Sequence, residues 1–242
     1  MFFPSRSTIA LAIFASQTLA CASHENGGLG KLKSRETPSN GTKADWAYEA
    51  SFDWGRINSA YSTCQNGTQQ SPIALSLSNG LALNHTDHPS FTYDNATTYL
   101  KGWHIHAPAN HSVGGMRSKA ELHLVHVDAA GHEAAVLAIR LDPGNFDAPF
   151  FTQMPTFVPF SDLATQQPLS MNLNGALESV LMFNEFWTYQ GSLTSPPCTE
   201  GIRWFVARQI MFLGVEQMQA ILGASTYSAR AEQQVWRHRI NE

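Results

Sequence analysis

Three histidines carry the clearest chemical pattern in this chain. His104 and His106 are two residues apart, and His123 lies in a second apolar run, Glu-Leu-His-Leu-Val-His. Residues at i and i+2 of a β-strand point to the same face. A neighbouring antiparallel strand can bring the third imidazole within reach of the first two. Three neutral imidazoles with one open position are a ligand set of catalytic zinc.

Spacing alone leaves two questions open. Imidazole also binds copper and iron, so the ligand type does not fix the metal. A histidine on an apolar strand is also commonly a hydrogen-bonded core residue. Glu121 favours the metal interpretation, because it lies two residues before His123 and its carboxylate can accept the other N–H of that ligand. His126 has the opposite parity to His123, so we expect it to be structural.

Short alternating runs predict the strands that must position these side chains. The segments between them carry turn residues, such as Asp142-Pro143-Gly144. The predicted strands cover 90–93, 98–106, 119–128, 134–141, 182–188 and 202–206. Two helices are expected, over 147–157 and over 215–222, the second with Gly223 as its stop. These elements predict a single, mostly β domain.

Composition sets broad limits on function. The 242 residues are 43% hydrophobic and 14% charged, which is enough apolar material for one substantial core. The formal net charge is −4. This balance gives no support for a nucleic-acid partner or an anionic membrane surface, since both favour a basic patch.

The first residues are typical of a targeting segment. Arg6 precedes the apolar run IALAIFA, and small residues follow at Ala20-Cys21-Ala22. We interpret 1–22 as a secretory signal peptide, 23–43 as a flexible polar leader and 44–242 as the domain. A buried N-terminal helix is the alternative. The apolar run is too short to span a bilayer, which needs about 20 residues. No second long apolar run follows, so we expect a secreted, extracellular protein without a membrane anchor.

Secretion bears on the cysteines and on glycosylation. Cys21 lies in the predicted signal peptide, which leaves Cys64 and Cys198 as a disulfide or as two buried thiols. An oxidising compartment favours the disulfide. A secreted protein can also carry glycans on N-x-S/T sequons. Five such sequons occur, at Asn40, Asn66, Asn84, Asn95 and Asn110.

Four motifs together resemble the α-class carbonic anhydrases of the secreted, microbial or fungal type. They occur in family order, and the match runs from about Trp46 to Arg239. The motifs are QSPI at 70–73, Trp103–His106, AELHLVH at 120–126 and GSLTSPPCTEG at 191–201. The resemblance implies a large twisted, mostly antiparallel sheet with short peripheral helices. It also implies a Cys64–Cys198 disulfide, a small-molecule substrate and a monomer or homodimer.

The resemblance further implies a reaction and its residues. Zinc on His104, His106 and His123 would carry the hydroxide that attacks carbon dioxide in its reversible hydration to bicarbonate and a proton, with weak esterase activity as a side reaction. The hydroxyl of Thr194 would orient this hydroxide, and its backbone N–H would bind a substrate oxygen. The remaining matches are Tyr48 for a water network, Ser195 for a neighbouring hydroxyl, and Val125, Val136, Leu193, Ile202 and Trp204 for the apolar substrate pocket.

Two positions depart from the family pattern. Asn110 stands where the family has a glutamate that accepts the hydrogen of the threonine. Its amide oxygen can accept from Thr194, but its NH₂ could face Thr194 instead. Gly102 stands where the family often has a glutamine bonded to the first ligand. The proton shuttle is assigned to His85, with His88 as the second choice.

Two other functions fit parts of the pattern. The first is a non-catalytic extracellular binding module with this fold. Such relatives usually lose one or more ligand histidines, whereas all three are present here. The second is another zinc hydrolase, such as an esterase. The apolar pocket without a substrate-binding charge favours a small neutral substrate, and the chain has no G-x-S-x-G motif.

Overall fold

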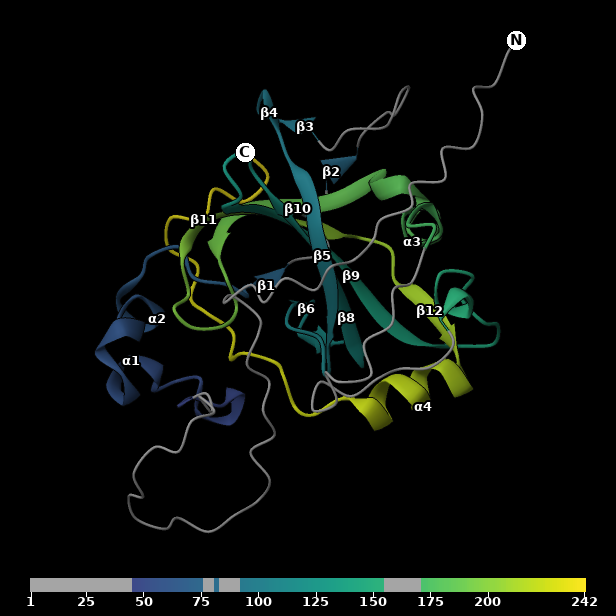
Figure 1. Ribbon diagram of the computed structural model, residues 1–242, viewed down its shortest axis with the longest axis horizontal. Helices are drawn as coiled ribbons and strands as arrows, with labels where there is room; N and C mark the ends of the chain where they lie inside the picture. Colours follow the sequence, from purple (N-terminus) through teal and green to yellow (C-terminus); the bar gives the residue numbers. More distant parts are fainter. Residues whose placement is uncertain (1–44, 76–80, 83–91, 155–170) are drawn as a thin grey trace.

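A computed structural model describes residues 45–75, 81–82, 92–154 and 171–242. The predicted signal peptide, the predicted leader up to residue 43, and the candidate shuttle residues His85 and His88 lie outside these ranges. A seven-stranded sheet forms the centre of the described part (Figure 1). None of the helices in these ranges is long and apolar enough to cross a membrane.

The sheet is mixed, with antiparallel pairs in the majority. Strand β9 pairs in parallel with β11 and β12, and the other neighbours are antiparallel. The predicted mostly antiparallel sheet is therefore confirmed. The strands, in spatial order, are β2 (Leu81–Ala82), β10 (Glu185–Ser192), β11 (Glu200–Ala207), β9 (Glu133–Gly144), β8 (Ala120–Val127) and β5 (Tyr99–His106), with β12 (Met211–Gly214) beside β9.

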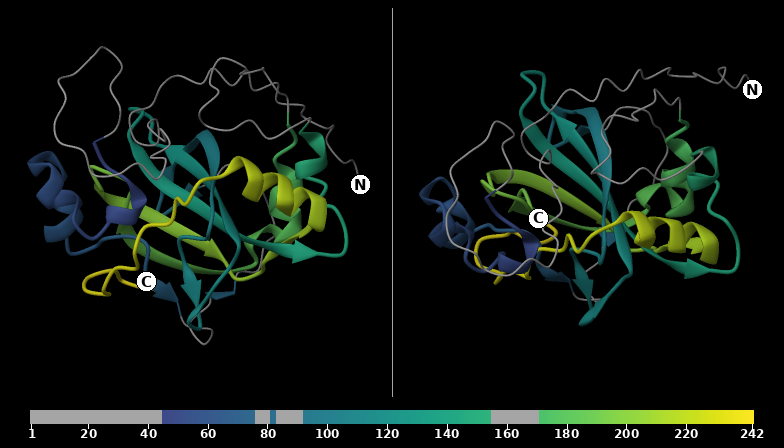
Figure 2. Two further views of the ribbon diagram at one scale, coloured as in Figure 1. Left: turned by 90° about the horizontal axis from the view of Figure 1, so that it is seen from below. Right: turned by 60° about the horizontal axis from the view of Figure 1, so that its bottom comes forward.

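Short elements surround this sheet. Helices α1 and α2 lie on one side of the molecule and α3 and α4 on the other, in both Figure 1 and Figure 2. The helices are α1 (Trp54–Ile57), α2 (Thr63–Asn66), α3 (Asn174–Ser179) and α4 (Val215–Ala224), with 3₁₀ turns η1 (Tyr48–Ala50), η2 (Ser59–Tyr61), η4 (Phe151–Gln153) and η6 (Leu181–Phe183). Two small sheets join β1 (Ala74–Leu75), β6 (Ser112–Val113) and β7 (Met116–Arg117), and β3 (Thr92–Tyr93) with β4 (Ala96–Thr97).

The central predicted strands agree with the structure within a few residues, but three predictions differ: one helix, the start of one strand and the stop of the last helix at Gly223. The helix over 147–157 is wrong, because its described part forms only the 3₁₀ turn η4. Met154 is extended, at φ −95° and ψ 129°, as expected for a residue that precedes a proline. The strand expected from residue 182 begins at Glu185, because Met182 has φ 56° and lies in η6. Helix α4 passes through Gly223 and ends at Ala224.

Strand β8 divides its side chains between two apolar clusters. Leu122 and Leu124 belong to a first cluster with residues of α3, α4 and β9. Val125, on the opposite face, belongs to a second cluster built around Trp187 and Trp204. This alternation follows from the two-residue period of a strand. It places His123, which has the parity of Val125, on the face of the second cluster.

A disulfide joins Cys64 of α2 to Cys198, 134 residues later in the chain. Both cysteines are buried and pack with Tyr48 and Trp54. The pairing implied by the family resemblance is thus present in the structure. It ties the segment after β10 to the helices on the α1 and α2 side.

We expect Cys64 and Cys198 to resist alkylation until the native protein is reduced. Mass spectrometry of unreduced peptides should recover the two segments as one linked species. Replacing both cysteines with alanine should lower the free energy of unfolding by roughly 2–5 kcal/mol, because the unfolded chain loses a long-range constraint. Urea denaturation measures this change. Alkylation of both cysteines in unreduced protein would contradict the assignment.

Candidate metal centre

The pairing of β5 with β8 brings the predicted ligands together. His104 lies directly opposite His123, and His106 lies directly opposite Glu121. Opposite residues of an antiparallel pair project from the same face of the sheet. The strand spacing and the pairing thus place all four side chains side by side, as the sequence predicted.

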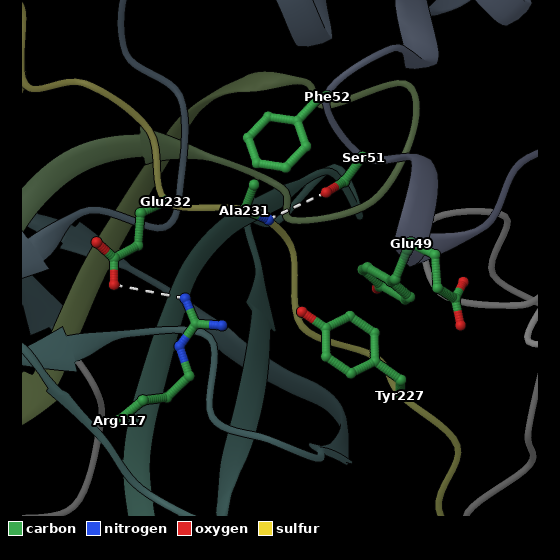
Figure 3. Close-up of a pocket in the computed structure, with 8 residues that line it drawn as sticks. Glu49, Ser51, Phe52, Arg117, Tyr227, Ala231 and Glu232 are labelled. Atoms are coloured by element: carbon green, nitrogen blue, oxygen red, sulfur yellow. Dashed lines mark hydrogen bonds and ion pairs between the residues drawn. The ribbon is translucent and has the colours of Figure 1, made fainter.

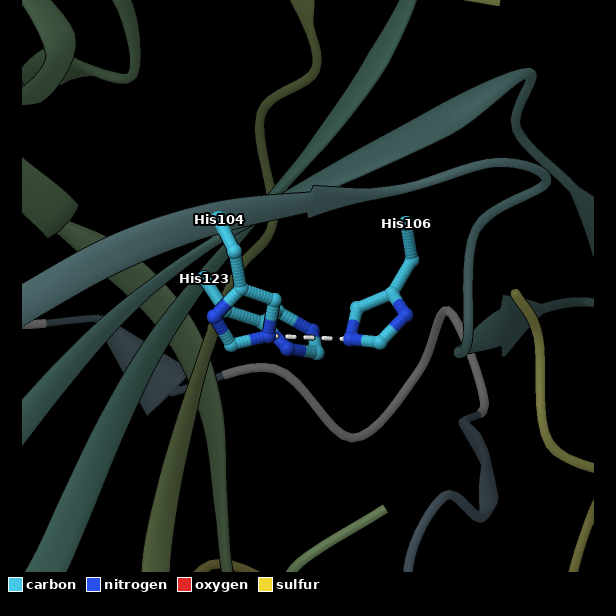
Figure 4. Close-up of side chains that lie close together, drawn as sticks. All are labelled: His104, His106 and His123. Atoms are coloured by element: carbon cyan, nitrogen blue, oxygen red, sulfur yellow. Dashed lines mark hydrogen bonds between the residues drawn. The ribbon is translucent and has the colours of Figure 1, made fainter. Parts of the chain in front are cut away.

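The three imidazole rings point toward one another (Figure 4). The Nε2 atoms of His104 and His106 are 3.0 Å apart, and one ring nitrogen of each of the three histidines lies within 4.8 Å of the others. Two nitrogens bound to one tetrahedral zinc at about 2.0–2.1 Å are roughly 3.3 Å apart. His106 and His123 are buried and His104 is half-buried. The geometry of these residues therefore fits a single metal ion.

Hydrogen bonds fix which nitrogen can bind a metal in two of the rings. Nδ1 of His106 lies 2.6 Å from the carbonyl oxygen of Ser228 and must donate to it, which leaves a lone pair on Nε2. Nε2 of His123 lies 2.7 Å from Oε1 of Glu121 and donates in the same way, which leaves a lone pair on Nδ1. The carboxylate of Glu121 therefore lies where the spacing placed it, on the other N–H of His123.

His111 is a member of the site that the sequence reasoning missed. Its Nδ1 lies 2.6 Å from Oε1 of Glu121, and its backbone N–H donates to Oε2 at 2.9 Å. Its Nε2 lies 2.7 Å from the hydroxyl of Tyr189, which in turn lies 3.0 Å from Oγ of Ser71. The sequence held only two weak signals of this network. His111 directly follows Asn110, and Ser71 belongs to the QSPI motif.

His111, Glu121 and His123 also form a group of three potential ligands. The distances within this second group are those of hydrogen bonds, since Oε1 of Glu121 lies 2.6 Å and 2.7 Å from the two ring nitrogens. The carboxylate thus holds two imidazole N–H groups. In contrast, the ring nitrogens of the first group converge without a carboxylate between them.

Burial and neighbouring groups shift the pKa values of Glu121 and His123. Burial alone would raise the pKa of Glu121, but His111 and then His123 outweigh burial and hold this pKa well below its usual range. Burial lowers the pKa of His123, although Glu121 opposes this effect. At neutral pH Glu121 is therefore ionised and His123 is neutral, which is the protonation state that metal binding by His123 needs.

The predicted apolar pocket residues gather beside the histidines. All five belong to the second apolar cluster, and Trp204 packs edge-on to His123 at 4.9 Å and to His111 at 5.0 Å between ring centroids. Ser195 is also buried, and its carbonyl oxygen accepts the backbone N–H of Cys198. The five cluster residues are Val125, Val136, Leu193, Ile202 and Trp204.

Tyr48 lies between the histidines and a surface cavity. Its ring is edge-on to His106, with 5.8 Å between centroids. It also lines a cavity of about 400 Å³, where Arg117 pairs with Glu232 on the side opposite Glu49 (Figure 3). The three histidines do not line this cavity, so we place the candidate chemistry at the histidine cluster.

Asn110 connects Thr194 to the main chain of Arg230. Its Oδ1 accepts the backbone N–H of Arg230 at 2.9 Å, and its Nδ2 lies 3.3 Å from Oγ1 of Thr194. The sequence left open which end of the Asn110 amide faces Thr194. In the structure it is the NH₂. Asn110 is fully buried.

Burial also separates the sequons. We expect Asn110 to stay unglycosylated, because its side chain is enclosed and hydrogen-bonded to Arg230 and Thr194. Asn66 and Asn95 are exposed and remain candidate sites, and Asn40 and Asn84 lie outside the described residues.

A family model for eukaryotic-type carbonic anhydrase matches residues 98–240, which hold all three histidines and Thr194. The chain belongs to the eukaryotic-type carbonic anhydrase family. The prediction of a carbonic anhydrase is thus confirmed, and carbon dioxide hydration is the general reaction of the family. These enzymes act on small molecules, in agreement with the expected substrate class.

Individual relatives support the same assignment. A carbonic anhydrase of Klebsiella pneumoniae is 29% identical over 201 residues, which cover 72% of this chain and 80% of the relative. Dioscorin DB3S of Dioscorea polystachya is 26% identical and covers 69% and 71%. The α-carbonic anhydrase structure from Photobacterium profundum has a TM-score of 0.61 at 24% identity, covering 78% and 95%. This last likeness concerns the fold.

Replacing Glu121 with glutamine should weaken zinc binding by about 10–100-fold, because His123 loses a charged acceptor that fixes its tautomer. Competition with a chromophoric chelator measures the zinc dissociation constant. The matched control is Glu216→Gln, which removes an exposed carboxylate on α4 and should leave zinc affinity unchanged. Equal zinc affinities in the two variants would contradict a supporting role for Glu121.

His126 is buried on the opposite face of β8, as its parity predicted, and its Nδ1–H donates to the carbonyl of Leu124 at 2.9 Å. Burial lowers its pKa from 6.5 to about 4. The unfolded chain therefore binds more protons between these values, so stability should fall as pH drops from 6.5 to 4.

This histidine should contribute up to roughly 3 kcal/mol to that loss. Urea denaturation between pH 4 and pH 7 tests the expectation in His126→Leu, whose pH dependence should be flatter than that of the parent. His132→Leu, at an exposed histidine, is the control and should retain the parental slope. A parental slope in His126→Leu would contradict this prediction.

Proposed function

We propose that this chain catalyses the zinc-dependent reversible hydration of carbon dioxide to bicarbonate and a proton. The supporting observation is the convergence of His104, His106 and His123, with lone pairs fixed on Nε2 of His106 and Nδ1 of His123. Zn²⁺ bound there would supply a hydroxide nucleophile at neutral pH, because it lowers the pKa of a water molecule to about 7.

The protein residues hold this arrangement before substrate arrives. Glu121 and the carbonyl of Ser228 orient two of the rings, and His111 with Tyr189 holds Glu121 in turn. Positions fixed in advance need no reorganisation during the reaction. We assign His104, His106 and His123 as ligands and Glu121 and His111 as positioning residues.

The neighbouring residues suit a small neutral substrate. The second apolar cluster includes Val125, Leu193 and Trp204, and Trp204 packs against His123. Such a wall favours carbon dioxide over a charged substrate, while the backbone N–H of Thr194 would hold a developing oxyanion. We include Val136, Ser195 and Ile202 in this pocket. Weak hydrolysis of activated esters would be a side reaction at the same place.

Proton transfer to solvent needs a further group. We assign it to His85, with His88 as the second choice, although both lie outside the described residues. Tyr48, beside His106, would order water between the centre and such a group.

Secretion completes the proposal. The Cys64–Cys198 disulfide favours a compartment outside the cytosol, in line with the signal peptide inferred at 1–22. We propose an extracellular monomer or homodimer with glycans at exposed sequons. The alternative is an extracellular binding module with this fold. The intact set of three histidines favours the enzyme.

We expect purified protein to hold about one zinc ion per chain and to hydrate carbon dioxide in a stopped-flow assay. His123→Ala should lose most zinc and lower the hydration rate by more than about a hundredfold, since even supporting groups are worth 10–100-fold. His132→Ala, at an exposed histidine, should retain both properties. Unchanged zinc content in His123→Ala would refute the ligand assignment, and zinc-loaded protein without hydration activity would favour a binding module.

A further inference from the structure

We propose that Thr194 donates its hydroxyl hydrogen to an anion bound at the histidine centre, so that this centre prefers anions without a hydrogen on the binding atom. The inference rests on the proposed zinc function. It concerns ligand selectivity, which follows from the direction of the hydrogen bonds through Asn110.

The backbone of Arg230 sets the orientation of the Asn110 amide. A backbone N–H only donates, so the atom 2.9 Å from it must be the amide oxygen. The guanidinium of Arg230 is buried and donates to the carbonyl oxygens of Ser71 at 2.7 Å and Cys64 at 3.0 Å. It also lies 5.4 Å from the ring centroid of Trp54. These contacts hold the donor in place and disfavour an amide flip.

The NH₂ of Asn110 must then face Thr194. An amide NH₂ has only hydrogens to offer, so Oγ1 of Thr194, 3.3 Å away, is the acceptor. A hydroxyl has one hydrogen and two lone pairs. With one lone pair directed to Asn110, the hydroxyl hydrogen is available to another acceptor. Leu193, the neighbour of Thr194, belongs to the same apolar cluster as Trp204, which packs on His123, so we place the proposed centre on that side.

A carboxylate at position 110 would impose the opposite direction. It would accept the hydroxyl hydrogen and leave only lone pairs of Thr194 to face a ligand, which would then have to carry a hydrogen. Asn110 reverses the direction of this hydrogen bond, and it is also neutral. It therefore lacks the negative charge that would repel a bound anion. The missing charge favours any anion, whereas the direction of the hydrogen bond favours unprotonated anions such as thiocyanate over an aromatic sulfonamide, which retains an N–H when it binds as an anion.

Asn110→Asp is the sharpest test, because it exchanges the NH₂ for an oxygen without a change of size. Calorimetry on zinc-loaded protein at about pH 8.5 would give the dissociation constants of thiocyanate and of an aromatic sulfonamide. A hydrogen bond to a charged group is worth about 10–150-fold in affinity. In Asn110→Asp we therefore expect the affinity for thiocyanate to fall by at least about tenfold relative to the affinity for the sulfonamide. The added charge disfavours both probes, so the ratio is decisive.

Thr194→Val removes the hydroxyl and keeps the shape, and it provides a second test if the aspartate variant does not fold. In the parent background it should weaken thiocyanate by about tenfold or more. In the Asn110→Asp background it should leave thiocyanate binding unchanged or tighter, because the hydroxyl no longer donates to the anion there.

Zinc content separates the two proposals. With one zinc per chain, a thiocyanate-to-sulfonamide ratio that stays constant in Asn110→Asp, or thiocyanate binding that survives Thr194→Val, overturns this inference and leaves the proposed function intact. A parent protein that binds no zinc overturns both. A shifted ratio together with weaker thiocyanate binding in Thr194→Val supports the inference.

Discussion

The register between β5 and β8 is the constraint on which the candidate centre depends. It sets His104 opposite His123 and His106 opposite Glu121. A slip by one residue would turn all the ligands of one strand to the other face. Apolar packing prevents the slip, because Leu122 and Leu124 fill the first cluster from the opposite face of β8. The apolar residues on one face of β8 therefore fix the register that aligns the histidines on its other face.

The register alone does not make a metal site, because an unsupported imidazole can rotate and change tautomer. Glu121 removes that freedom for His123. His111, whose other ring nitrogen contacts the hydroxyl of Tyr189, holds the carboxylate of Glu121 in turn. A buried carboxylate is costly unless its oxygens are hydrogen-bonded. Here they receive two imidazole N–H groups and one backbone N–H. The bonds that compensate for burial are the same bonds that orient the ligand.

The sequence predicted what depends on local periodicity. The i, i+2 spacing of His104 and His106, the parity of Glu121 and His126, and the central strands all follow from the period of a strand. Residues that approach the site from irregular segments were not predictable in this way. His111 and Arg230 have no periodic neighbours to mark them. The orientation of Asn110 was also undetermined, because both ends of an amide are polar and only its partner distinguishes them.

The segment after α4 shows why this partner is so remote in sequence. It follows the edge of the site beyond any regular element, where Ser228 accepts from His106 and Arg230 donates to Asn110. From this segment the side chain of Arg230 also donates to the carbonyl oxygens of Cys64 and Ser71. One buried arginine thus connects the disulfide-bearing helix, the QSPI motif and the residue that faces Thr194. Strand pairing positions the candidate metal ligands, whereas this irregular segment determines the direction of the hydrogen bonds around them.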